Sequence, residues 1–103
     1  MRLFLVKDGQ REVWVAALAN EHMYSYVDNT GFFHDNNALR NDYYMDFDYE
    51  YEEIDIARAK ELIAAGIGRL DETTRADALT KWRNDPRPLP VRDVFAAVAG
   101  LTP

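Results

Sequence analysis

The 103-residue chain contains no cysteine, which excludes disulfide bonds and thiolate chemistry. It also lacks long apolar runs: the longest, Val13–Ala19, is far shorter than the ~20 residues that a membrane-spanning helix needs. With 48% apolar and 13% aromatic residues, the composition is that of a folded globule rather than of a disordered acidic chain. We therefore expect one domain, residues 1–103, that is soluble and located in the cytoplasm.

Basic residues are missing from one stretch, because no lysine or arginine lies between Arg40 and Arg58. Within it, residues 42–55 read DYYMDFDYEYEEID and contain seven acids and five aromatic residues. This segment carries a charge of −7, whereas the net charge of the whole chain is −6. Such concentrated charge is suited to a basic partner, while the overall acidity disfavours direct binding to nucleic acid or to an anionic membrane.

Motifs for catalysis and metal binding are absent. Asp46-x-Asp48-x-Glu50 resembles the opening of a calcium-binding EF-hand loop, but Tyr51 stands where that loop needs glycine and Ala57 where it needs a bidentate glutamate. The sequence predicts no catalytic residue, no metal site and no cofactor, and hence a protein that is not an enzyme.

The two histidines, His22 and His34, are the residues on which an enzyme hypothesis would rest. With Glu21 or Asp35 they form a set that can bind a transition metal or supply a general base. They flank a predicted hairpin, which would bring them near each other. The spacing of a known metal site is missing, so we treat this as the weakest of three hypotheses.

The N-terminal half is expected to form strands. Asp8-Gly9 lies between two apolar runs and predicts a hairpin, because a tight turn needs residues that tolerate positive φ. A two-residue turn there would place Leu3 opposite Trp14. One face of this hairpin would then hold Leu3, Leu5, Trp14 and Ala16, half apolar and in need of a cover. The opposite face, the expected core, would hold Phe4, Val6, Val13, Val15 and Ala17.

A second hairpin is predicted from Met23–Val27 and Phe32–His34, and a further strand from Met45–Glu52. The latter alternates strictly between apolar and acidic residues. We expect Met45, Phe47, Tyr49 and Tyr51 to be packed, and Asp46, Asp48, Glu50 and Glu52 to be solvated. Arg2, Lys7 or Arg11 on a neighbouring strand would reduce the repulsion within the acidic row.

The period changes to that of helices after residue 55. Asp55 can cap a helix from Ile56 to Ala65, and Asp71 or Thr73 can cap a second that ends near Arg83. A third helix is expected after the proline-rich stretch 85–90. The fold class is therefore α+β: an antiparallel sheet of four to five strands, mainly in residues 1–54, with helices of residues 55–100 packed on one face.

The first functional hypothesis is a small acidic inhibitor, similar in role to an immunity protein, an antitoxin or a nucleic-acid mimic. Its acidic-aromatic strand would occupy a basic site on a protein partner, and a nuclease or another nucleic-acid-binding protein is one such partner. The predicted contact residues are Asp42, Tyr43, Tyr44, Asp46, Asp48, Glu50 and Glu52. The alternative is a structural or regulatory interaction module, which could form a homodimer through the Leu3/Leu5/Trp14 face.

Overall fold

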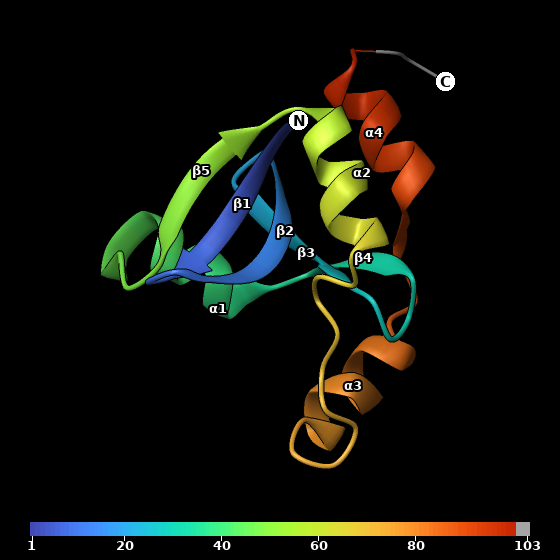
Figure 1. Ribbon diagram of the computed structural model, residues 1–103. Helices are drawn as coiled ribbons and strands as arrows, with labels where there is room; N and C mark the ends of the chain where they lie inside the picture. The colour runs from blue at the N-terminus through green and yellow to red at the C-terminus, as the bar shows by residue number, and fades with distance from the viewer. Residues whose placement is uncertain (101–103) are drawn as a thin grey trace.

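A computed structural model describes residues 1–100, in which six antiparallel strands form one sheet in the order β5-β1-β2-β3-β4-β6 (Figure 1). The first four strands follow one another as a meander, and the two edges are closed by strands from later in the chain. The strands are β1 (Arg2–Asp8), β2 (Arg11–Ala19), β3 (His22–Val27), β4 (Phe32–Asp35), β5 (Glu50–Ile54) and β6 (Leu89–Pro90).

Helical segments cover both faces of this sheet. They are α1 (Asn37–Asn41), the π-helical turn η1 (Asp42–Asp46), α2 (Ile56–Ala64), α3 (Ala76–Arg83) and α4 (Val91–Val98). Neighbouring residues of β1 point to opposite faces. Leu5 packs with Leu62 of α2 and Val94 of α4, whereas the next residue, Val6, lies in a cluster with α1 and α3.

The α+β class and the antiparallel sheet are therefore confirmed, with two differences in detail. The sheet has six strands rather than four to five, because Leu89–Pro90, expected to be part of a linker, pairs with the edge of β4. The later helices are also divided between the faces: α3 lies opposite α2 and α4. The predicted cap of α2 is present, since Asp55 accepts the N–H of Arg58 at 2.8 Å.

The first hairpin is confirmed, but its register differs from the expected one. Val6 pairs with Trp14 while Lys7 pairs with Glu12, so Val13 is an extra residue that forms a β-bulge. The turn and the bulge together place Leu3 opposite Ala17 instead of Trp14.

The predicted Leu3/Leu5/Trp14 face does not exist as a surface. Leu3 and Leu5 lie in the cluster under α2 and α4, whereas Trp14 lies in the cluster under α1 and α3. All three side chains are buried, at 1%, 1% and 6% exposure, so they offer no contact area to a second copy of the chain. The reason is the shifted register, which moves residues of one strand relative to the other and thereby changes which of them share a face.

The strand expected over Met45–Glu52 is mostly replaced by another structure. The chain forms η1 up to Asp46, Phe47 adopts a left-handed backbone, and β5 begins only at Glu50. From there the strand pairs with β1 and continues to Ile54, beyond the predicted end. The strict alternation of residues 45–49 therefore does not correspond to an extended backbone.

Candidate functional site

The acidic segment begins with a buried anchor, Asp42. Asp42 is only 5% exposed, and its two carboxylate oxygens accept three hydrogen bonds. Oδ1 accepts the N–H of Asp48 at 2.9 Å, and Oδ2 accepts the N–H of Tyr49 at 3.2 Å and the hydroxyl of Tyr51 at 2.8 Å. Asp42 was predicted to contact a partner. It instead holds the turn between η1 and β5, because a buried carboxylate must be satisfied by donors.

Tyr51 completes this anchor. Burial raises the pKa of its hydroxyl well above the usual value, and the adjacent Asp42 carboxylate raises it further. The hydroxyl therefore remains a donor to Asp42 across the physiological range. The ring lies edge-on to that of Tyr43, with centroids 5.0 Å apart, and Tyr43 in turn packs against Phe4 at 5.6 Å. Tyr43, a predicted contact residue, is thus half-buried and mainly supports the turn.

Residues 44–48 project beyond this anchor, and we refer to them as the tip. Tyr44 is 44% exposed, Met45 65% and Phe47 70%; of the large apolar side chains in residues 1–100, only Phe32 is also classed as exposed. Phe47 has a φ of 55°, a conformation that is an outlier for a bulky side chain. Its strain is balanced by the hydrogen bonds of Asp42, including the bond from the N–H of Phe47 to the Asp42 carbonyl oxygen at 2.8 Å.

A hollow of about 440 Å³ lies beside the tip and is lined by five aromatic side chains. We call it the aromatic hollow, and its residues are Tyr43, Tyr44, Phe47, Tyr49 and Tyr51. Three exposed acids, Asp46, Asp48 and Glu50, come from the same stretch of chain, and none has an ion-pair partner within the described residues 1–100. Aromatic faces and carboxylates together form a chemical environment that attracts an ammonium or guanidinium group.

Two acids near the end of the segment, Glu52 and Glu53, are already paired. Glu53 accepts two hydrogen bonds from the Arg2 guanidinium, at 3.1 and 3.0 Å, and Glu52 lies 3.4 Å from Lys7. The hydrogen bonds from Arg2 hold the pKa of Glu53 below its usual value. Lys7 thus has the role predicted for it, whereas Arg2 pairs with Glu53, which lies outside the predicted acidic row. Glu52, a predicted contact residue, is exposed but shares its charge with a neighbouring strand.

The structure therefore gathers part of the predicted site and adds two residues that the sequence did not indicate. Tyr44, Asp46, Asp48 and Glu50 are exposed near one another, whereas Asp42 is internal and Tyr43 half-buried. Met45 and Phe47 were expected to be packed, because they alternate with acids. No local signal in the sequence shows that hydrogen bonds to Asp42 prevent these residues from forming a strand, since the donors lie six to nine residues after Asp42.

The two histidines occupy different environments. His22 is exposed and lies 3.9 Å from the Asp35 carboxylate. His34 is buried, with its Nδ1 2.8 Å from the Asp85 carboxylate and its Nε2 2.7 Å from the Thr30 hydroxyl. Over residues 1–100 the structure contains no group of three or more His, Cys, Asp or Glu side chains that could hold a metal ion.

Thr30, His34 and Asp85 are arranged like a nucleophile, a base and an orienting acid. Acyl transfer also needs free N–H donors to stabilise an oxyanion. The N–H groups of Thr30 and Gly31 both donate to the Val27 carbonyl, and that of Phe32 donates to the Thr30 hydroxyl. These N–H groups already donate within the protein and cannot bind an oxyanion. The three side chains instead form a buried polar connection between β4 and the segment after α3.

Asp85 illustrates how that connection is balanced. Burial alone would raise the pKa of its carboxyl, but hydrogen bonds from His34 and from the N–H of Arg87 outweigh burial, and the pKa lies below the usual value. The His34 ring also stacks on Trp82 of α3, with centroids 6.1 Å apart. The network therefore fixes α3 against the sheet.

Comparison of the chain with protein-family models, with curated proteins and with solved structures finds no match. Across residues 1–100, none of the helices combines the length and the apolar character needed to cross a membrane. A functional assignment therefore depends on the geometry of the sites themselves.

Proposed function

We propose that this protein inhibits a protein partner by placing its tip and aromatic hollow against a basic site of that partner. The observation that supports the proposal most directly is the combination of exposed apolar side chains with unpaired acids. Tyr44, Met45 and Phe47 are exposed, and Asp46 and Asp48 lie among them without internal ion pairs in the described chain. A small set of desolvated apolar anchors with a charged rim is how binding surfaces usually concentrate their free energy.

The tip is also held in shape before any partner arrives. The three hydrogen bonds to the Asp42 carboxylate fix the backbone on the C-terminal side of the tip, and Phe47 remains in a strained conformation. A surface that is ordered in the free protein loses less conformational entropy on binding. This supports a role as a rigid binding element rather than a segment that folds on its partner.

The partner class follows from charge. The unpaired acids would attract lysine- and arginine-rich surfaces, and complementary charge accelerates association and makes it sensitive to salt. Proteins that bind nucleic acid, nucleases among them, present such surfaces. The proposal includes neither catalysis nor a cofactor, and it places the protein in the cytoplasm, as the absence of cysteine favours.

The test is capture of a partner from a host lysate by three baits, at low and at high salt. One bait is the wild type and one carries Asp46→Asn, Asp48→Asn and Glu50→Gln. The third is a control of equal net charge that carries Asp8→Asn, Glu21→Gln and Asp77→Asn, whose carboxylates are exposed and unpaired within residues 1–100.

We expect a basic protein to be captured by the wild type and the control at low salt and released at high salt. The variant at Asp46, Asp48 and Glu50 should not capture it. Addition of the wild-type protein should then reduce the activity of the captured partner. Equal capture by all three baits would contradict the use of the tip, and undiminished partner activity would contradict inhibition.

A further inference from the structure

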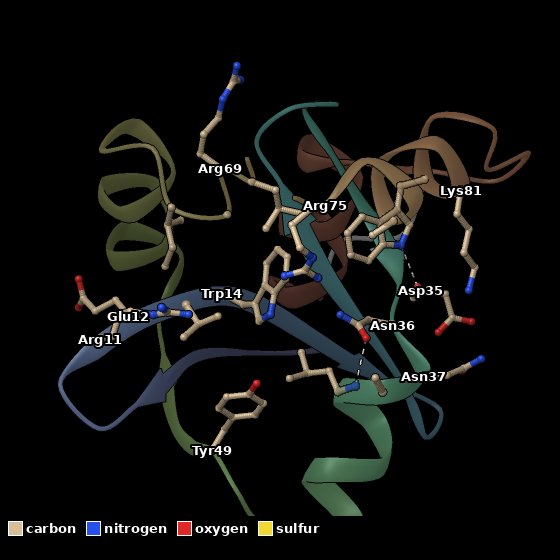
Figure 2. A pocket seen from close by; sticks show the side chains of 18 of the residues that line it. Arg11, Glu12, Trp14, Asp35, Asn36, Asn37, Tyr49, Arg69, Arg75 and Lys81 are labelled. Carbon is tan, nitrogen blue, oxygen red and sulfur yellow. Dashed lines mark hydrogen bonds between the residues drawn. The ribbon is translucent and has the colours of Figure 1, made fainter. Parts of the chain in front are cut away.

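A second hollow lies on the sheet face that carries α1 and α3 (Figure 2). We call it the tryptophan cleft, because both tryptophans of the chain, Trp14 and Trp82, line it. Their rings meet edge-on with centroids 6.0 Å apart. The cleft has a volume of about 650 Å³, which lies in the range of ~300–1,000 Å³ typical of small-molecule sites.

The charge around the tryptophan cleft is opposite to that of the chain as a whole. Arg11, Arg75 and Lys81 line it, and within the described residues no carboxylate lies within 4.0 Å of any of them. The two acids of the lining offset only part of this charge. Glu12 pairs with Arg58 at 3.3 Å, whereas Asp35 has no lysine or arginine partner within residues 1–100 and leaves one negative charge beside the three positive ones.

Figure 2 shows how these cations are placed. The Arg75 guanidinium reaches over the middle of the tryptophan cleft, between Trp14 and Asn36, while Lys81 lies on the side of Asp35. Arg69 points away from the cleft and pairs with Asp28 at 3.5 Å. The lining therefore presents positive charge both above its aromatic floor and at its rim.

Unpaired cations on a surface are common, but in this protein they are concentrated at one cleft. Six of the 12 lysines and arginines form ion pairs in the structure, and three of the other six line this one cleft. In a protein of net charge −6, such a cluster creates a local positive field over a low-dielectric floor. Guanidinium groups also match the geometry of phosphate oxygens.

We propose that the tryptophan cleft binds a small organic phosphate that carries a flat ring. The ring would enter the cleft and touch the small part of each tryptophan that its lining leaves accessible, 6% of Trp14 and 9% of Trp82, and the phosphate would contact Arg75 together with Lys81 or Arg11. This site contains none of the tip residues 44–48, although Tyr49 lines both this cleft and the aromatic hollow, and it does not depend on the proposed inhibition. A nucleoside monophosphate has both required parts and serves as the probe.

The two tryptophans make the experiment specific, because the protein has only two indole N–H signals and both arise from the cleft. The ¹⁵N-labelled protein is titrated at low salt with adenosine monophosphate, with inorganic phosphate and with adenosine. We expect the monophosphate to shift both indole signals to saturation, and the phosphate or the nucleoside alone to bind more weakly.

Variants test the cations. Arg75→Gln and Lys81→Gln should each weaken binding about tenfold, in line with the loss of a hydrogen bond to a charged group. Arg87→Gln and Lys60→Gln remove exposed cations that lie outside the cleft and should leave the affinity unchanged. The proposal is overturned if the monophosphate gives no saturable shift, if adenosine binds as well, or if Arg75→Gln and Arg87→Gln have the same affinity.

Discussion

Two parts of the acidic segment have similar sequences and opposite surroundings. In the tip, Asp46 and Asp48 are exposed and unpaired within residues 1–100, and the neighbouring apolar side chains of Met45 and Phe47 face solvent. In β5, Glu52 and Glu53 are held by Lys7 and Arg2 of the neighbouring strand. The difference shows that a run of acids has no uniform role: Glu52 and Glu53 are neutralised because basic side chains of the neighbouring strand reach them, whereas Asp46, Asp48 and also Glu50 at the start of β5 have no such partner within residues 1–100.

The largest expected effect comes from Asp42, which precedes both parts and bonds to Asp48 in the tip and to Tyr51 in β5. Asp42→Asn keeps the shape of the side chain but replaces one acceptor oxygen with a donor that faces other donors. Because a buried hydrogen-bond network is broken, we expect the free energy of unfolding to fall by about 2–4 kcal/mol. Urea denaturation followed by tryptophan fluorescence measures this. The matched change in the tip, Asp46→Asn, should stay within about 0.5 kcal/mol; equal losses in both variants would remove the distinction between anchor and tip.

The next effect should come from Tyr51→Phe, which removes the hydroxyl that donates to Asp42. We expect a loss of about 1–2 kcal/mol in the free energy of unfolding. Combined with Asp42→Asn, the two losses should not add, because the residues share one network. Strict additivity in this double-mutant cycle would show that the two side chains do not cooperate in holding the turn.

Phe47→Gly separates stability from binding in the tip. Glycine adopts a φ of 55° without steric cost, and Phe47 buries little surface, so we expect stability to be unchanged or to rise by about 1 kcal/mol. Capture of a basic partner should nevertheless be lost, because an exposed aromatic anchor has been removed. Retention of full capture by this variant would place the contact surface elsewhere.

The smallest effect concerns the paired acids of β5. The folded-state pKa of Glu53 is depressed by Arg2, so this pair stabilises the fold above the unfolded-state pKa, and the stabilisation is lost as the pH falls through the folded-state pKa. Both groups are exposed, so the contribution to stability should be minor and screened by salt. An NMR titration of the Glu53 carboxyl should show its pKa below the usual value in the wild type and close to it in Arg2→Gln. An unchanged pKa in that variant would mean that Arg2 does not hold Glu53.

The sequence was sufficient for features that depend on local residues. The hairpin at Asp8-Gly9, the cap at Asp55 and the α+β class all follow from turn preferences, capping and a change of period. It was insufficient where a residue acts at a distance. The bulge at Val13 appears only when β1 and β2 are aligned, and the role of Asp42 appears only when Tyr51 has joined β1.

For the candidate site, the sequence predicted the exposure of the alternating acids correctly but not that of the apolar residues next to them. Alternation identified Asp46, Asp48 and Glu50 as solvated, and they are, but it placed Met45 and Phe47 in a core that does not form there. Alternating residues lie on opposite faces only where the backbone is extended. Here, backbone N–H groups bond to a carboxylate instead of a neighbouring strand.

The strand order also bears on how the chain assembles in time. Strands β1 to β4 form a meander with short connections, whereas β5 pairs with β1 across about half of the chain, as in the pairing of Leu3 with Ile54. Short-range contacts generally form before long-range ones, because closing a long loop costs more entropy. We therefore expect the meander to belong to the folding nucleus and β5 to be added later. Since Asp42 gains its bond from Tyr51 only at that stage, the tip takes its final shape among the last parts of the molecule.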